Sequence, residues 1–144
     1  KHKEFNVVFC TLFQIYGSND NESNILPYLI NQIKLNKNAL LGSCKGYRDW
    51  IYIDDIMKMF LQVINLKSKN LQNFDFGTGD LIQIRTMVEE ISNFFPNSLK
   101  LIKYNKKLDK DDDFKDAYAK LIPTNSKELI NYKAGLKKLI GNEN

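Results

Sequence analysis

The 144-residue sequence has one histidine, two cysteines and two arginines. With only His2, at the amino terminus, neither a histidine-based zinc site nor a Ser-His-Asp triad has the residues it needs. Cys10 and Cys44 are far apart, which does not suit a small disulfide framework and favours a reducing cytoplasm. Arg48 and Arg85 are too few, and the lysines too scattered, for the basic face of a nucleic-acid-binding protein, so we expect no nucleic-acid partner.

Several common signatures are also missing. The sequence has no P-loop and no nucleophile elbow, and its longest apolar runs are too short to span a bilayer, so we expect no membrane partner. Asp109 and the acidic residues of 111–116 lack the glycine and final glutamate of an EF-hand loop, which predicts a solvated loop and no metal site. Hydrophobic residues make up 43%, charged residues 26% and the net charge is +4, as in ordinary globular proteins. Without an interior linker, residues 1–144 are predicted to be a single domain or fragment.

The apolar pattern predicts alternating strands and helices. Asn6 to Ile15 is almost continuously apolar, which indicates a strand buried on both faces of a parallel sheet. Helical spacing of apolar residues predicts helices over 25–35, from 54 or 55 onward, and from 84 to the stop at Pro96. The core-facing stripe of the second helix is predicted to be Ile56, Met57, Phe60, Leu61 and Ile64. Further predictions are strands over 39–42, 50–53, 74–76 and 99–104, a charged loop over 106–116, and helical turns over 126–130 and 134–140. This alternation is typical of the α/β class.

Arg48 and Asp49 stand at the mouth of a short strand and are the most informative pair in the chain. A guanidinium can hold phosphate oxygens bidentately, and a neighbouring carboxylate can orient nearby groups. From spacing alone, a surface ion pair between the two residues, contributing little, is an equal alternative.

The strand that follows is rich in aromatic residues and leads into a helix. We expect Trp50 and Tyr52 on opposite faces, one in the core and the other meeting solvent or ligand. Asp54 or Asp55 is expected to cap the helix rather than to act in catalysis.

Gly77-Thr78-Gly79 superficially resembles a dinucleotide-binding fingerprint. Ile82 occupies the place of the third glycine, and no downstream ribose-binding acid follows in a βαβ unit. We interpret the segment as a tight turn that remains able to contact a ligand.

In order along residues 5–95, five segments resemble the C-terminal half of an NAD-dependent sugar-nucleotide epimerase/dehydratase of the extended short-chain dehydrogenase/reductase family. They are Leu12-Phe13-Gln14-Ile15-Tyr16-Gly17, Asn24-Ile25-Leu26-Pro27-Tyr28, Ala39-Leu40-Leu41-Gly42, Arg48-Asp49-Trp50-Ile51-Tyr52-Ile53-Asp54-Asp55 and Phe74-Asp75-Phe76-Gly77-Thr78-Gly79. The resemblance implies the C-terminal part of a Rossmann-type fold: the last parallel strands and a small α/β substrate lobe, lacking the N-terminal dinucleotide-binding half.

The resemblance also implies a binding site for a nucleotide-diphosphate sugar. Its substrate-binding residues would be Gln14 at the sugar or diphosphate, Asn24 and Ile25 along the diphosphate and nucleoside, Leu40 and Leu41 at the base, and Arg48 at the diphosphate. Lys115 would stand where the family commonly has a second diphosphate-binding arginine, and Phe13 would lie near the nicotinamide. Core packing is the alternative for Phe13 and the two leucines.

The residues of the family's chemistry are not in this sequence. None of the seven tyrosines has a lysine four residues later, and no glycine-rich NAD loop occurs. The resemblance therefore implies NAD or NADP in the complete enzyme, but no catalytic residue on this chain, no cofactor bound by it alone, and no activity in isolation.

The missing N-terminal Rossmann half is the expected partner. Without it, the strand around residues 6–15 should leave an open sheet edge through which the chain forms homo-oligomers. Two alternatives stay open: a non-catalytic nucleotide- or protein-binding module derived from the family, and a small enzyme of unrelated chemistry.

Overall fold

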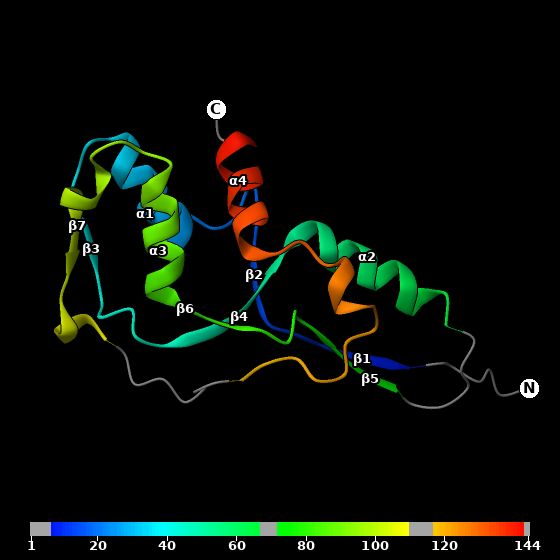
Figure 1. Ribbon diagram of the computed structural model, residues 1–144. Helices are drawn as coiled ribbons and strands as arrows, with labels where there is room; N and C mark the ends of the chain where they lie inside the picture. Colours follow the sequence, from blue (N-terminus) through cyan, green and yellow to red (C-terminus); the bar gives the residue numbers. More distant parts are fainter. Residues whose placement is uncertain (1–6, 67–71, 110–116, 143–144) are drawn as a thin grey trace, which may run out of the picture.

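The computed structural model describes residues 7–66, 72–109 and 117–142 (Figure 1). In chain order the elements are β1 (Val8–Leu12), β2 (Gln14–Tyr16), α1 (Ile25–Lys34), β3 (Ala39–Leu41), β4 (Tyr47–Tyr52), α2 (Ile53–Ile64), β5 (Gln72–Phe76), β6 (Leu81–Gln83), α3 (Ile84–Asn93), the 3₁₀ turn η1 (Ser98–Leu101), β7 (Ile102–Tyr104), the 3₁₀ turns η2 (Lys106–Leu108) and η3 (Ser126–Glu128), and α4 (Tyr132–Asn142). Strands and helices alternate, which confirms the α/β class. His2, Lys115 and the acidic segment 111–116 lie outside the described residues.

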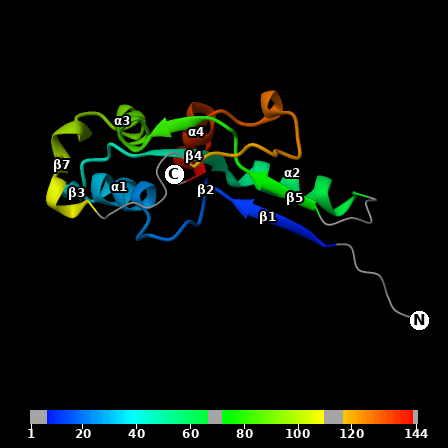
Figure 2. The same cartoon turned by 90° about the horizontal axis from the view of Figure 1, so that it is seen from below.

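The strands form three small sheets. β1 pairs in parallel with β5, β4 joins β2 in parallel and β6 in antiparallel, and β3 pairs in parallel with β7. Phe13 links β1 to β2, and its backbone N–H donates to the Phe76 carbonyl at 3.2 Å. The continuous extended segment formed by β1, Phe13 and β2 therefore pairs first with β5 and then with β4. Figure 2 shows β1 and β5 at one end of the molecule and β3 and β7 at the other; we call α1, β3, α3, η1 and β7 the small lobe.

The first strand is not buried on both faces, so that part of the prediction is wrong. The side chains of Phe9 and Leu12 are 59% and 50% exposed, whereas Val8 and Cys10 pack against the cluster beneath α2. Within the described residues, β1 pairs with a strand only on the β5 side. Strand alternation directs Phe9 away from this cluster, whereas Leu12, on the same face as Val8 and Cys10, is exposed at the end of the strand.

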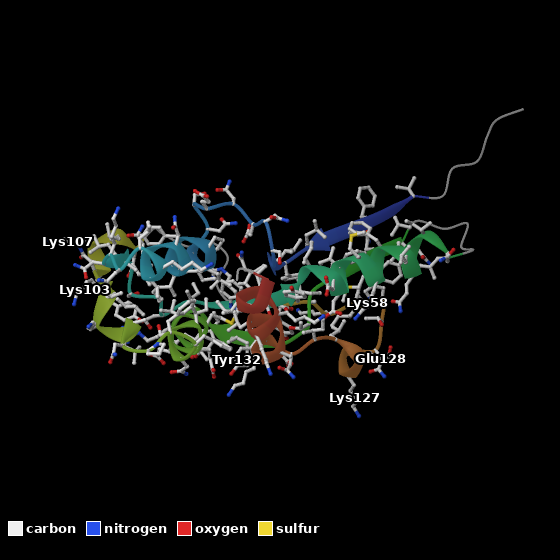
Figure 3. All side chains as sticks on the ribbon, turned by 90° about the horizontal axis from the view of Figure 1, so that it is seen from above. Lys58, Lys103, Lys107, Lys127, Glu128 and Tyr132 are labelled. Atoms are coloured by element: carbon white, nitrogen blue, oxygen red, sulfur yellow. The ribbon has the colours of Figure 1, made fainter. Side chains whose placement is uncertain are left out.

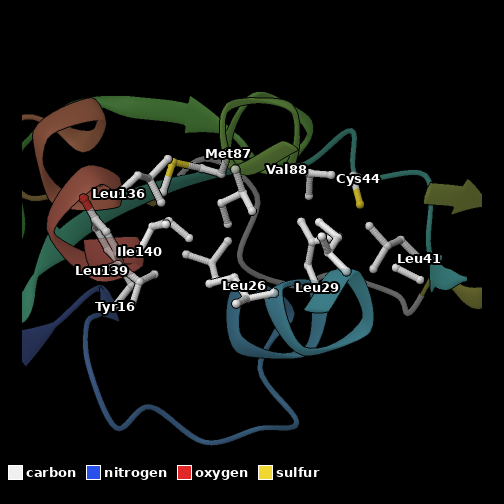
Figure 4. Packing of buried hydrophobic residues seen from close by; sticks show 14 of the residues in the cluster. Tyr16, Leu26, Leu29, Leu41, Cys44, Met87, Val88, Leu136, Leu139 and Ile140 are labelled. Atoms are coloured by element: carbon white, nitrogen blue, oxygen red, sulfur yellow. The ribbon is translucent and has the colours of Figure 1, made fainter. Parts of the chain in front are cut away.

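Two apolar cores lie on opposite faces of β4. The larger one is built by α1, α3 and α4, with Leu29, Val88 and Leu136 almost completely buried in it (Figure 4). The smaller one lies beneath α2 and contains Ile51 and Phe76. Because successive strand residues point to opposite faces, β4 contributes side chains to both cores and holds them together.

Trp50 and Tyr52 both belong to the larger core, at 4% and 2% exposure. The ring of Tyr16 meets each of them edge-on, with centroid distances of 6.1 and 5.5 Å. The expectation that one of the two would meet ligand is wrong, because strand residues two apart share a face.

The start of α2 also differs from the prediction. Tyr52 occupies the N-cap position, so Asp54 and Asp55 lie in the first turn instead of capping it. Asp55 is fully buried and accepts hydrogen bonds from Lys58 Nζ at 2.7 Å and from the Ile130 N–H at 2.6 Å. The carboxylate therefore anchors the segment before α4 to α2. Its negative charge also interacts favourably with the positive end of the α2 dipole.

Three of the five residues predicted to face the core from α2 are instead exposed: Met57 at 57%, Leu61 at 61% and Ile64 at 74%. The buried face runs through Met59 and Val63. The helix has apolar residues on more than one face, so helical periodicity alone does not select the buried one.

Most remaining predictions hold with shifted boundaries, but the first half of the strand predicted over 99–104 lies in the η1 turn, and only Ile102–Tyr104 form a strand. The helices predicted from 25 and from 84 are confirmed as α1 and α3, whereas β6 was not predicted. Segment 126–130 contains only the short η3 turn, and α4 begins before the predicted 134. Among the described residues, no helix has the length and apolar character needed to cross a membrane.

Gly135 and Gly141 provide a matched test of the packing between α4 and β2. A Cβ at Gly135 would collide with Oη of the buried Tyr16, which donates to the Tyr132 carbonyl at 3.3 Å, whereas a Cβ at Gly141 would meet nothing within 4 Å. We expect Gly135→Ala to lower the free energy of unfolding by about 1–3 kcal/mol, and Gly141→Ala to leave it unchanged or raise it by up to about 1 kcal/mol. Urea unfolding followed by circular dichroism measures both, and equal effects would contradict the packing described.

Candidate functional site

Asp49 is the centre of the region that carries the predicted site. Its carboxylate is 1% exposed and accepts four hydrogen bonds. The Thr78 N–H and hydroxyl both donate at 2.7 Å, and the Gly79 and Ala119 N–H groups donate at 2.9 Å. These contacts fasten the turn after β5 and the segment at residue 119 to β4.

The turn at residues 77–79 is shaped by this carboxylate. A Cβ at Gly77 would lie 2.6 Å from Asp49 Oδ2 and 2.8 Å from the Ala119 Cβ, and Gly79 has φ of +83°. The interpretation as a tight turn is confirmed, but the turn leads from β5 into β6 and not directly into a helix. Because the N–H groups of Thr78 and Gly79 already donate to Asp49, they do not fit the role of holding a dinucleotide pyrophosphate.

Arg48 points to the other side of β4. The alternative of a surface ion pair fails because the Asp49 carboxylate is buried. Arg48 is partly exposed, and its Nη1 donates to the Tyr47 carbonyl at 2.6 Å. Gln14 lies opposite Trp50 in the β2–β4 register, so Gln14 and Arg48 flank Trp50 on one face, with backbones roughly 8 Å apart. The structure brings these two predicted residues together.

Asn24 and Ile25 lie at the start of α1. Asn24 occupies the N-cap position, and its Nδ2 donates to Asp20 Oδ1 at 2.7 Å, so its side chain organises the preceding loop. Ile25 is partly buried and packs against the larger core. The start of the helix is thereby fixed relative to β4.

Leu40 and Leu41 face opposite ways. Leu41 is 4% exposed and belongs to the larger core, whereas Leu40 is 51% exposed. The Leu40 N–H donates to the Tyr28 hydroxyl at 3.2 Å, which ties β3 to α1. Of the two leucines assigned to the base, only Leu40 is open to a ligand.

The loop after β3 is closed by Asp109. The Ser43 N–H donates to Asp109 Oδ1 at 2.6 Å, and this hydrogen bond to the charged form lowers the pKa of the Asp109 carboxyl. A Cβ at Gly42 would lie 2.5 Å from the same oxygen. Asp109 therefore fixes the turn beside β3. Phe13, assigned to the nicotinamide, is partly buried at the junction of β1 and β2.

A separate pocket of about 280 Å³ lies between the 17–22 loop, α1 and α4. Asp20, Glu22 and Lys34 line it, with Leu139 from α4. None of the predicted substrate-binding residues that the structure describes lines this pocket. In the described part of the chain, no group of three or more His, Cys, Asp or Glu residues is arranged to hold a metal ion.

The sequence did not reveal the role of Asp49, nor the position of the Arg85 guanidinium, whose central carbon lies 4.1 Å from the centroid of the Tyr104 ring. The hydrogen-bond partners of Asp49 lie 29, 30 and 70 residues further along the chain, beyond the range of any local motif. Arg85 had one available signal, that it is one of only two arginines.

The fold and the motifs define a Rossmann-like α/β protein of the short-chain dehydrogenase/reductase type. Residues 1–77 match the model of the NAD dependent epimerase/dehydratase family. The chain belongs to this family, as the resemblance of its five segments predicts.

Similar proteins include a CDP-abequose synthase of Salmonella muenchen, 28% identical over 121 residues, which cover 83% of this chain and 41% of that protein. The structure of MoeE5 in complex with UDP-glucuronic acid and NAD superimposes with a TM-score of 0.74 at 15% identity, over 94% of this chain and 46% of that one. The UDP-glucose 4-epimerase of Thermotoga maritima with UDP-glucose gives 0.71 at 16% identity, over 93% and 44%. The chain thus spans less than half the length of each of these proteins.

Replacing Asp49 by asparagine tests the anchor. The substitution Asp49→Asn removes the negative charge, and its amide nitrogen would face an N–H donor at either oxygen position. We therefore expect it to lower the free energy of unfolding by about 3 kcal/mol or more. Asp80→Asn, at an exposed residue of the same turn, should change it by less than about 0.5 kcal/mol. Chemical denaturation compares the two variants, and similar stabilities would show that Asp49 does not anchor the turn.

Proposed function

We propose that this chain forms the nucleotide-sugar-binding part of an NAD(P)-dependent sugar-nucleotide epimerase, dehydratase or reductase. In this proposal Arg48 binds the diphosphate, and Gln14 binds the diphosphate or sugar. Asn24 and Ile25 line the nucleoside side, and Leu40 lies at the base. Leu41 supports the strand from within the core, and Lys115, outside the described residues, is the second cation.

The observation that carries the proposal is the placement of Arg48 on β4 and Gln14 on the neighbouring β2, on one face of the same sheet. A planar guanidinium next to a carboxamide provides directional donors and an acceptor for phosphate and hydroxyl groups. Asp49 holds the adjoining turn, so Arg48 stands on a fixed strand. The nucleotide sugars bound in the similar MoeE5 and Thermotoga maritima structures support the ligand class.

Hydride transfer requires groups that this sequence does not contain, namely a glycine-rich NAD loop and a Tyr-x-x-x-Lys pair. The residues described here do not fit NAD on their own, since the amides of the 77–79 turn donate to Asp49. We propose that NAD or NADP is bound by a dinucleotide-binding part, with Phe13 contributing near the nicotinamide, and that the 144 residues alone are inactive. The free thiols of Cys10 and Cys44 suit a cytoplasmic enzyme.

The open side of β1 and the exposed side of α2 are the proposed contact surface for that dinucleotide-binding part. Phe9 on β1 and Met57, Leu61 and Ile64 on α2 are large apolar side chains exposed by more than half. A parallel strand usually has neighbours on both sides, and exposed apolar surface of this kind marks an interaction site. A non-catalytic module that binds a partner protein through the same surface is the second candidate function.

Binding of nucleotide sugars tests the role of Arg48. We expect Arg48→Met to weaken the binding of UDP-, CDP-, GDP- and dTDP-sugars to the full-length natural protein by about 10- to 100-fold, because charge-assisted hydrogen bonds to the diphosphate are lost. Lys45→Met, which removes an exposed charge from the same segment, should have little effect. Isothermal titration calorimetry gives the affinities, and equal affinities of wild type and Arg48→Met would refute the assigned role.

Self-association tests the contact surface. The 144-residue chain expressed alone should form dimers or larger species as its concentration rises, because β1 and α2 expose apolar surface. Leu61→Gln should reduce this association, whereas Lys137→Gln, at an exposed position on α4, should not. Light scattering measures the mass, and a folded monomer at every concentration would contradict the expectation.

A further inference from the structure

The base end of the proposed site lacks an exposed flat side chain among the residues predicted from the sequence. Trp50, Tyr52 and Leu41 are all buried in the larger core and cannot stack on a ligand. Leu40 is exposed but is not flat. Nucleobases are commonly held by stacking on aromatic rings or on arginine planes, so another planar group near β3 is needed.

Arg85 and Tyr104 supply such a surface next to β3. The central guanidinium carbon of Arg85 lies 4.1 Å from the centroid of the Tyr104 ring. Tyr104 is 38% exposed, and it lies opposite Leu41 in the β3–β7 register. Because register partners share a face, Tyr104 lies on the Leu41 face of β3, and the pair presents a cation backed by an aromatic ring on the face opposite Leu40.

The main chain and this stacking contact fix the position of Arg85. Its backbone N–H, in the first turn of α3, donates to the Cys44 carbonyl at 2.9 Å. The buried Arg85 Nε has no hydrogen-bond acceptor among the described atoms. The ring of Tyr104 is thus the main side-chain contact of the guanidinium, and Arg85 as a residue is partly exposed.

The two arginines of the chain are attached to one short stretch of backbone. The backbone N–H of Arg85 is hydrogen-bonded to the carbonyl of Cys44, and Arg48 follows Cys44 by four residues. The backbones of Cys44 and Arg48 are therefore at most about 14 Å apart. One arginine lies beside Gln14 at the proposed diphosphate position, and the other lies beside β3. Their spacing along this stretch suits an elongated ligand with phosphates at one end and a base at the other.

We propose that Arg85, supported by Tyr104, is the base-recognition residue of the nucleotide-sugar site. The nucleobase stacks on the guanidinium face turned away from Tyr104, and the outer N–H groups donate to acceptors on the base edge. This inference rests on the proposed function, since it assigns one end of the same ligand, and it moves the base from Leu40 to the opposite face of β3.

Calorimetry on the full-length natural protein separates base recognition from phosphate binding. The ligands are UDP-glucose, CDP-glucose, GDP-mannose and dTDP-glucose, with inorganic pyrophosphate measured by competition as the ligand without a base. We expect Arg85→Met and Tyr104→Leu to weaken the preferred nucleotide sugar by about 5- to 150-fold and to reduce the differences among the four bases. Affinity for pyrophosphate should be unchanged.

Three variants serve as controls. Arg85→Lys keeps the charge without the plane and should lose base discrimination as Arg85→Met does. Lys103→Met removes a charge next to Tyr104 at the outer surface of the small lobe (Figure 3) and should leave all affinities unchanged. Arg48→Met should weaken pyrophosphate and nucleotide sugars alike.

The possible failures are distinguishable. Unchanged base preference in Arg85→Met, with normal binding by the wild type, would overturn this inference and leave the proposed function standing. If Arg85→Met loses as much affinity for pyrophosphate as for the nucleotide sugars, Arg85 binds the phosphates instead, and this inference is also overturned. If the wild type binds none of the nucleotide sugars, the proposed function itself fails, and this inference fails with it.

Discussion

The hydrogen bonds accepted by the buried carboxylate of Asp49 are the interaction on which the rest of the proposed nucleotide-sugar site depends. It joins β4 to the turn that begins at Gly77 and to the segment at Ala119, which are distant in sequence. A buried charge with four donors is stable only while all of them stay in place, so it fixes the three segments as one unit. Strand alternation then directs the side chain of Arg48 to the opposite face.

β4 is the central element of the molecule for the same reason. Its two faces contribute to two cores, one beneath α2 and one among α1, α3 and α4. The small lobe is tied to this framework through short backbone contacts, including the bonds from α3 to the chain between β3 and β4. A diphosphate and a base held at the two ends of that chain segment would therefore meet positions that are fixed before binding, which limits the entropy lost on binding.

Much of the fold could be predicted from the sequence, because α1 and α3 each have a single apolar stripe that selects one buried face. The buried face of α2 was misassigned because the helix has apolar residues, Leu61 among them, on more than one face. Which of these faces packs against the rest of the protein is not encoded in the local sequence. Of the proposed site, Arg48 and Gln14 were predicted from family motifs. Asp49 and Arg85 were not, because long-range hydrogen bonds and a contact with β7 define their surroundings.

The central claim is that one nucleotide sugar lies along the chain between the two arginines. A crystal structure of the full-length natural protein with its preferred nucleotide sugar tests this most directly. The account predicts diphosphate oxygens within hydrogen-bonding distance of the Arg48 guanidinium and the base stacked on Arg85. A nucleotide sugar bound elsewhere, for example in the pocket between the 17–22 loop and α4, would contradict it.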